Sequence, residues 1–338
     1  MKIGLKHYNK TFERQITIYL TDQNRNSGLF YRQKEGDLLI TKTKEELIRM
    51  YLESLEENKI PWRQRWNTSL NKNGITNTSY KGINQLLLSY VSYKEHYEDN
   101  RWFTYVQIKE KGYKLKNSKG KGVPIEFWSV YDIKNKKKIS FEEYNKIIDK
   151  TSDFKEQYKT FCNVTYVFNG SLIEGLKEID KAKNNNIQVN SYINKIIDKL
   201  KVKYKEEGDK AFYNTNEDQV VLPEKSKFLD KYSYYATQLH ELCHSTRHES
   251  RLNRFDINNK QDYAREELIA EISSSFLMQK LDINPKTEDY NNHKAYIQSW
   301  IQILKDKPNE LFKAINESNK VCEYIEDKMR NKERENIR

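Results

Sequence analysis

The segment HELCH at residues 240–244 constrains this chain more than any other stretch of its sequence. In a helix, residues four apart lie on one face, so the imidazoles of His240 and His244 can bind a single metal ion. Glu241 lies beside them and can take a proton from water at that ion, which makes it the candidate catalytic base. The segment therefore predicts a zinc site of the HExxH type, Zn2+ being the expected ion and Mn2+ the alternative divalent metal.

A third metal ligand is expected, because a catalytic zinc site uses three protein ligands and leaves one coordination position open. Glu267 and Glu271 are also four residues apart, so one helical face carries both carboxylates. We assign Glu267 as the metal ligand and Glu271 as the carboxylate that hydrogen-bonds a ligand imidazole, with the reverse assignment as the alternative. His248 is a rival ligand, but it lies too far along the same helix. Cys243 fits a small core residue better than a ligand.

The first half of the chain concentrates aromatic and basic residues. Four of the five tryptophans fall within residues 62–128, interleaved with lysines and arginines. Aromatic rings stack unpaired bases while nearby cations follow the phosphates, so the pattern indicates single-stranded nucleic acid. The alternative is that each tryptophan simply fills the core of a small domain. The candidate DNA-binding residues are Trp62, Arg63, Trp66, Tyr80, Lys81, Asn84, Arg101, Trp102, Lys119 and Lys121.

Charge and composition narrow the class of protein. The formal net charge is +11, which favours an anionic partner, although lysine is abundant along the whole sequence and charge alone does not indicate nucleic acid. The three cysteines have no motif spacing, so no disulfide framework is expected. The first 19 residues lack the apolar core of a secretory signal, and no apolar run reaches roughly 18 residues. We therefore expect a monomeric cytoplasmic protein with no membrane span.

Periodicity and length predict two domains that mix helices and strands. The expected helices cover residues 44–58, 79–93, 104–112, 233–247, 262–280, 293–305 and 309–328. The expected strands cover residues 15–20, 123–131 and 161–168, and a hairpin is expected over residues 212–222.

Several short segments occur together in this chain, at residues 61–63, 79–84, 101–104, 119–124, 127–128, 167–169, 221–223, 234–237, 240–244, 248–252 and 263–268. In this combination they resemble the ArdC-type antirestriction proteins of conjugative plasmids and phages, whose modules are related to those of plasmid primases and phage polyvalent proteins. The resemblance extends over about residues 44–328. Arg65 departs from it, because a second proline usually stands just before the tryptophan at this place.

This resemblance implies an α+β fold, with a small mixed single-stranded-DNA-binding domain followed by a mainly helical zincin-like metallopeptidase domain. The expected boundaries are an N-terminal extension at residues 1–40, the DNA-binding domain at 41–150 and the zincin-like domain at 151–338. The implied function is protection of a mobile element's DNA, with single-stranded DNA and a host restriction or defence protein as partners. Two alternatives stay open: a DNA-localised zinc metalloprotease that acts on a host protein, and a DNA-binding protein whose zinc is purely structural.

Overall fold

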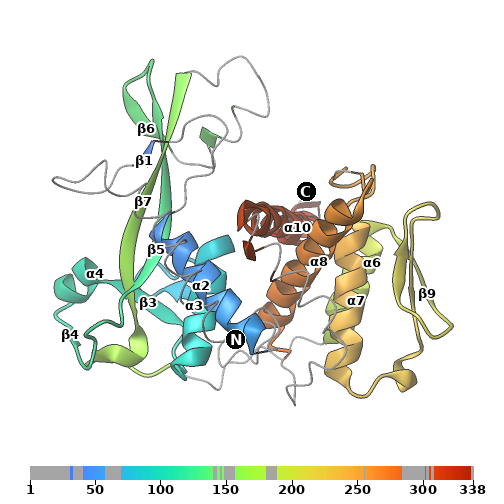
Figure 1. The fold of residues 1–338 in the computed structure, drawn as a ribbon, viewed down its shortest axis with the longest axis horizontal. Coiled ribbons are helices and arrows are strands. Elements are labelled where there is room, and N and C mark those ends of the chain that lie inside the picture. Colours follow the sequence, from blue (N-terminus) through green and yellow to red (C-terminus); the bar gives the residue numbers. More distant parts are fainter. Residues whose placement is uncertain are drawn as a thin grey trace, which may run out of the picture. The chain divides into compact units, whose positions relative to one another are not determined.

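The computed structural model describes residues 31–32, 41–57, 70–139, 143–144, 147, 157–179, 189–254, 256–283, 301, 304–305 and 308–335. The chain forms two compact units, one from Met1–Glu35 and Trp128–Asn163, the other from Gly36–Phe127 and Val164–Arg338. Figure 1 labels most of the elements that are described below. Strands β5 (Val123–Asp132) and β7 (Tyr158–Asn169) contribute residues to both units, so each unit is described by itself.

The described part of the first unit is built from paired strands. The end of β5 forms an antiparallel hairpin with β6 (Lys137–Ile139), and Asp132 closes the turn by accepting the backbone N–H of Asn135 at 2.9 Å. Lys136 at this turn adopts a left-handed conformation with φ 51°. The short strand β1 (Tyr31–Arg32) pairs antiparallel with β7.

The second unit begins with two helices beside a small sheet. Helix α2 (Lys42–Glu56) starts at Thr41, whose side chain caps the helix by accepting the backbone N–H of Lys44. It packs against α3 (Gly82–Lys94), as Figure 1 shows. The sheet order is β2-β3-β7-β5, where β2 is Lys72–Asn73 and β3 is Arg101–Thr104.

A small lobe follows β3. It contains α4 (Tyr105–Glu110) and β4 (Lys114–Leu115), which pairs with β8 (Ile173–Glu174) after the 3-10 turn η4 (Gly170–Leu172). Helix α4 starts with a capping box, in which Thr104 and Gln107 satisfy each other's backbone N–H groups.

The rest of the second unit is mainly helical. Its helices are α6 (Val189–Leu200), α7 (Lys231–Ser245), α8 (Lys260–Lys280) and α10 (Pro308–Glu335), with the 3-10 turn η6 (Lys225–Lys227) before α7. A three-stranded sheet has the order β10-β11-β9, from β9 (Lys203–Glu206), β10 (Phe212–Asn214) and β11 (Gln219–Leu222). Strand β10 therefore lies at an edge of this sheet.

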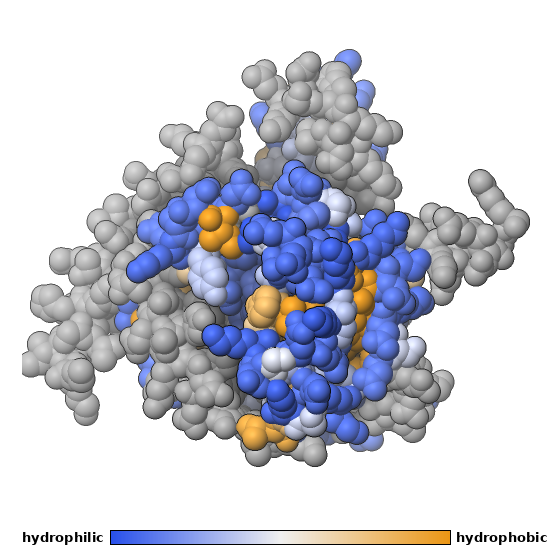
Figure 2. Space-filling view, turned by 90° about the vertical axis from the view of Figure 1, so that its right-hand side faces the viewer, coloured by the Kyte–Doolittle hydropathy of each residue, from blue (hydrophilic) through white to orange (hydrophobic). Residues whose placement is uncertain are grey.

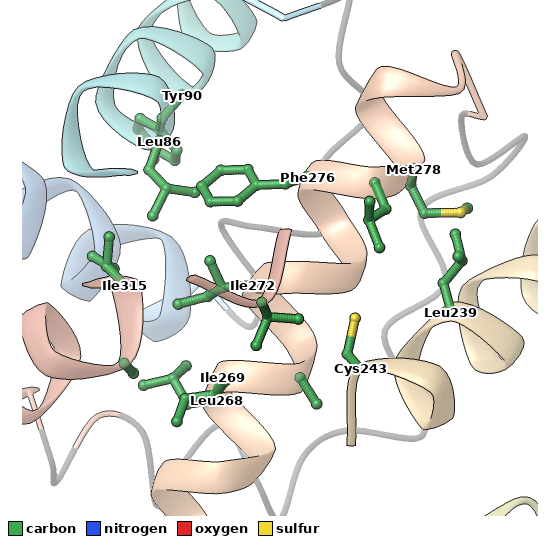
Figure 3. Packing of buried hydrophobic residues seen from close by; sticks show 14 of the residues in the cluster. Leu86, Tyr90, Leu239, Cys243, Leu268, Ile269, Ile272, Phe276, Met278 and Ile315 are labelled. Carbon is green, nitrogen blue, oxygen red and sulfur yellow. The ribbon is translucent and has the colours of Figure 1, made fainter. Parts of the chain in front are cut away.

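Helix α8 lies at the centre of this unit's hydrophobic core. Figure 3 shows α8 with Leu86 and Tyr90 of α3 near Phe276, and with Leu239 of α7 near Met278. Helix α10 packs along the same helix. Helix α8 is therefore buried on several sides. Through its contacts, α3, α7 and α10 share one continuous hydrophobic core.

A buried polar network also crosses this core. Gln279 of α8 accepts the side-chain amide of Gln85 at 2.9 Å and donates to the Ser89 hydroxyl at 3.0 Å. Ser89 accepts the Asn71 amide at 2.9 Å, and Asn71 in turn accepts the indole N–H of Trp102 at 2.7 Å. All five side chains are at most 3% exposed, so their polar groups depend on one another for hydrogen bonds.

The structure confirms most of the predicted elements that lie in the described residues. The helices predicted over residues 44–58, 79–93, 233–247, 262–280 and 309–328, the strands over 123–131 and 161–168, and the hairpin over 212–222 are all present, with ends that differ by a few residues. The predicted helix over 104–112 is shorter, because residues 101–104 form strand β3. The strand at 15–20, the boundary at 150/151 and most of the helix at 293–305 lie outside the described residues, and the domain limits stay predictions.

None of the helices in the described part of the chain is both long and apolar enough to cross a membrane. Figure 2 shows one face of the molecule, which is mostly hydrophilic with hydrophobic residues in small groups.

We expect Gln279→Ala to lower the free energy of unfolding by about 1–3 kcal/mol, because it removes a buried partner from both Gln85 and Ser89. Urea unfolding should be followed by far-UV circular dichroism and by tryptophan fluorescence. Since α8 belongs to the core of the whole unit, both signals should shift together. Gln261→Ala, at an exposed position of the same helix, is the control. It should change the free energy of unfolding by under about 0.5 kcal/mol. A shift in only one of the two signals would contradict the shared core.

Candidate metal centre

Helix α7 brings the two histidines of the HExxH segment together. The helix begins at Asp230, whose side chain accepts the backbone N–H of Ser233 at 2.8 Å. The imidazoles of His240 and His244 lie on the same face, with their Nε2 atoms 3.0 Å apart and only 13% and 12% of each side chain exposed. Two ring nitrogens that face each other at this distance suit a shared cation between them.

Glu267 of α8 completes a group of three. Its carboxylate oxygens lie 3.6 Å from His240 Nε2 and 3.5 Å from His244 Nε2. One ligand atom from each of the three residues lies within 4.8 Å of the others, and this is the one such group in the part of the chain that the structure describes. Two imidazole nitrogens and one carboxylate oxygen are a donor set that a catalytic divalent ion uses.

The electrostatics of the group favour a bound cation. Burial raises the pKa of Glu267, but the nearby His240 side chain and the charge of both histidines outweigh it and lower the pKa to about 2. For His240, burial lowers the pKa, whereas Glu267, Glu271 and Glu241 raise it above its usual value. Several carboxylates therefore concentrate negative charge around the imidazoles, which is the environment that a divalent ion neutralises.

Glu266 and Arg254 hold the Nδ1 side of the His244 imidazole. Neither residue was predicted from the sequence as part of the site. Glu266 Oε1 lies 3.1 Å from His244 Nδ1 and 2.5 Å from a guanidinium nitrogen of Arg254. Burial raises the pKa of Glu266, but the hydrogen bond to His244 and the charge of Arg254 lower it overall. A carboxylate at Nδ1 leaves Nε2 free to bind a metal. The available signal was that Glu266 is an acidic residue directly beside Glu267 on a predicted buried helix.

Glu271 lies close to the other histidine without a hydrogen bond. Its Oε1 is 3.7 Å from His240 Nδ1, which is beyond hydrogen-bond distance, and that nitrogen has no hydrogen-bond partner in the described structure. Glu271 therefore contacts His240 electrostatically, and its role behind the imidazole stays a prediction.

The carboxyl group of Glu241 interacts electrostatically with His240, His244 and Glu267. Glu241 is 7% exposed, and burial raises the pKa of its carboxyl group, opposed by the charges of His240 and His244. The backbone N–H of Tyr213 in strand β10 lies near this carboxyl group and opposes the rise of its pKa. A carboxyl group with a raised pKa beside two imidazoles is suited to act as a general base.

Arg251 ties strand β10 to the end of α7. Its guanidinium donates to the backbone carbonyl of Ser245 at 2.7 Å and of Leu200 at 3.1 Å, and it forms an ion pair with Asp218 in the β10–β11 turn. Tyr213 also donates to Asp218, at 2.8 Å. The edge strand is therefore fixed beside the histidine helix.

The rival ligands lie apart from the group. His248 Nδ1 lies 2.8 Å from the Ser250 hydroxyl and is not among the three converging residues. Cys243 is fully buried in the hydrophobic core, and burial raises the pKa of its thiol.

The proposed role of Trp102 in stacking a base does not agree with the structure. Trp102 is 0% exposed, donates its indole N–H to Asn71 and packs edge-on against Tyr97 with ring centroids 6.1 Å apart. A ring with no exposed surface cannot stack on a base, so Trp102 is a core residue. The alternative of core packing, which residue type alone did not exclude, holds at this position.

The other predicted DNA-binding residues differ in how far their side chains are exposed and already paired within the protein. Arg101 pairs with Asp99 at 2.6 Å, Lys81 pairs with Glu323 at 2.7 Å, and Lys121 pairs with Glu95. Asn84 bonds both backbone groups of Glu126, and Tyr80 is partly buried against the core. Lys119 is exposed, while Trp62, Arg63 and Trp66 lie outside the described residues.

Two domain families match the chain. Residues 41–168 match the N-terminal domain of anti-restriction factor ArdC, and residues 191–317 match a zincin-like metallopeptidase. A zincin-like domain implies a divalent metal ion, in agreement with the three converging side chains.

Relatives with known sequences or structures agree with both matches. Two proteins named DNA primase TraC from Escherichia coli are 32% identical over 289 residues and 31% identical over 296 residues. These alignments cover 81% and 83% of this chain but only 19% and 27% of the primases, so the chain spans about a fifth to a quarter of their length.

Two crystal structures of the antirestriction ArdC protein from plasmid R388 superpose with a TM-score of 0.65. The metal-free one is 25% identical and the Mn(II)-bound one 26% identical, and each match covers 86% of this chain and 99% of the other. Residues 41–168 therefore match the ArdC N-terminal domain and residues 191–317 a zincin-like metallopeptidase domain, and in this order they give the chain the architecture of the ArdC-type antirestriction proteins.

Proposed function

We propose that this protein is a single-stranded-DNA-binding antirestriction protein of a mobile element, with a divalent ion, Zn2+ or Mn2+, bound by His240, His244 and Glu267. The observation that carries the proposal is the convergence of these three side chains within 4.8 Å in a chain that also has an ArdC N-terminal domain. The net charge of +11 supports a nucleic-acid partner. A host restriction or defence protein is the proposed second partner.

The metal centre has the groups that hydrolysis of an amide requires. A divalent ion at His240, His244 and Glu267 would polarise an oxygen atom of water or of a carbonyl group. Glu241, with its raised pKa, would accept a proton from an attacking water and return it to the leaving amine. Glu266 keeps His244 in the orientation and tautomer that present Nε2 to the ion.

A second candidate function is a DNA-localised metalloprotease that cleaves a host protein. The specific observation in its favour is the position of β10, an edge strand of the described three-stranded sheet whose Tyr213 backbone N–H lies near Glu241. An extended peptide that added to the open edge of β10 would bring a backbone carbonyl next to the proposed base. A purely structural ion is the third candidate, and a fourth protein ligand would be its signature.

We expect His240→Ala and Glu267→Gln to abolish binding of one equivalent of Zn2+ or Mn2+, since each removes one of three ligands. Glu271→Gln should retain the ion with an affinity reduced by roughly 10–100-fold, because its carboxylate supports His240 without binding the ion. Competition titration against a chromogenic chelator, with metal content measured by mass spectrometry, gives both values. The reverse order, with Glu271→Gln losing the ion and Glu267→Gln keeping it, would exchange the roles of the two carboxylates.

The full-length chain should bind single-stranded DNA more tightly than duplex DNA of the same length. Each base that stacks on an aromatic side chain contributes roughly 1–3 kcal/mol, and paired bases are not available for stacking. Fluorescence anisotropy with labelled oligonucleotides at several salt concentrations measures the affinities, which should fall steeply as salt rises. Equal affinities for the two forms of DNA would argue against base stacking.

Protection from restriction should survive Glu241→Gln, because the proposal assigns protection to DNA binding. The assay is transfer of unmodified plasmid DNA into a restriction-proficient host that expresses each variant. A protease that needs Glu241 as its base would instead lose activity by roughly 10²–10⁴-fold. Loss of protection in Glu241→Gln, with metal content and DNA affinity unchanged, would favour the protease.

A further inference from the structure

The small lobe formed by residues 104–121, together with β8, folds around its own core. Phe103, Ile108 and Ile173 are at most 4% exposed and form a separate hydrophobic cluster, against which Tyr113 and Leu115 pack. We refer to residues 104–121 as the basic lobe. Because this cluster is supplied from within the lobe and its neighbouring strands, the outward-facing side chains of the lobe are not needed to hold it together.

Five exposed lysines lie on the basic lobe. They are Lys109, Lys111, Lys114, Lys116 and Lys119. No ion pair joins any of them to a described residue, whereas Lys81, Arg101 and Lys121 are paired with carboxylates. The acidic residues of the lobe and its paired strand are Glu110 and Glu174, the latter opposite Lys114 in the β4–β8 ladder. The lobe therefore has a clear excess of uncompensated positive charge.

The same lobe carries an exposed aromatic ring. Tyr105, the first residue of α4, is 62% exposed, and Val106 beside it is 61% exposed. Tyr105 and Lys109 are four residues apart, so they share one face of the helix. Gln107 fixes the start of this helix, since its side chain accepts the Thr104 backbone N–H at 3.0 Å and donates to Asn73 at 3.2 Å. The ring is thus presented on a well-defined turn.

The backbone between the lysines is also open. Gly112 and Gly120 have φ angles of +70° and +73°, and a Cβ atom at either position would meet nothing within 4 Å. Both glycines follow a lysine directly, Lys111 and Lys119, in turns that reverse the chain. A phosphate can therefore approach the main chain next to these two cations.

We propose that the basic lobe is the surface that binds single-stranded DNA, with Tyr105 stacking on a base and Lys109, Lys111, Lys116 and Lys119 contacting the phosphates. This inference rests on the proposed DNA-binding function and replaces Trp102 as the stacking residue. Flexible lysine side chains alone would accept any polyanion, but an exposed ring beside them adds a contact that only an unpaired base can make. Single-stranded DNA is therefore the partner that matches both features.

The test compares two triple variants of the full chain that remove the same charge. The lobe variant replaces three lysines of the basic lobe: Lys111→Ala, Lys116→Ala and Lys119→Ala. The control variant replaces three exposed lysines in other parts of the chain: Lys195→Ala, Lys210→Ala and Lys260→Ala. For single strands each phosphate contact contributes about 0.7 to the slope of log affinity against log salt, so the lobe variant should lose about 2 from that slope. At 0.1 M salt its affinity should fall roughly 30–100-fold, whereas the control triple should change little.

A second comparison tests the ring by itself. Tyr105→Ala should weaken binding of a single-stranded oligonucleotide roughly 5- to 150-fold, while Tyr105→Phe keeps the ring and should keep the affinity. Neither variant should change the binding of inorganic polyphosphate, which has no bases. The melting temperature of every variant should match the parent, because the replaced side chains are exposed.

The outcomes distinguish the assignment of the basic lobe as the binding surface from the proposal that the protein binds single-stranded DNA. Equal losses in the two lysine triples, or an unchanged affinity in Tyr105→Ala, would overturn the assignment of the lobe while DNA binding itself stands. Failure of the parent protein to bind any single-stranded oligonucleotide would overturn the proposed function and the lobe assignment with it.

Discussion

The structure depends on helix α8, because this helix supplies both a candidate metal ligand and the buried contacts that hold the second unit together. Glu266, Glu267 and Glu271 lie near its middle, and Gln279 lies about two turns after the last of them. Gln279 is hydrogen-bonded to Gln85 of α3 in a core from which water is excluded. A shift of α8 that broke this contact would leave polar groups unsatisfied, and it would also move the carboxylates of the metal centre. The position of Glu267 therefore depends on the packing of α8 against α3, whose residues are distant in the sequence.

The charges around the histidines favour a divalent metal ion at this place. Arg254 balances Glu266, so that carboxylate can be buried without further compensation. Glu267 and Glu271 lie 3.5–3.7 Å from the imidazole nitrogens, and Glu241 interacts electrostatically with both histidines. These carboxylates raise the pKa of His240 despite its burial. A divalent ion bound here would offset the negative charge of the carboxylates and leave the imidazoles neutral, which is the form that binds metal.

Local patterns in the sequence predicted the parts of the site that follow from helical geometry. The spacing of His240 and His244, and of Glu267 and Glu271, places each pair on one face whatever the rest of the chain does. The pairing of Glu266 with Arg254 depends instead on the path of the chain between α7 and α8. A periodic pattern of residues within one helix does not predict that path. The same limit applies to strand β3, whose four residues are too few for a periodic signal, so that no strand was predicted there and its last residue, Thr104, was placed in the predicted helix at 104–112.

Burial was the other property that residue types did not reveal. Trp102 and Tyr105 stand three residues apart on opposite sides of a strand-to-helix junction, yet Trp102 is 0% exposed and Tyr105 is 62% exposed. The alternation of side chains along β3 points Trp102 into the core, where Asn71 satisfies its indole N–H. Thr104 then ends the strand and caps α4, so the next aromatic ring leaves the core. A tryptophan has the larger aromatic surface for stacking, but the tyrosine has the exposed surface, and a base can only contact what the fold leaves open.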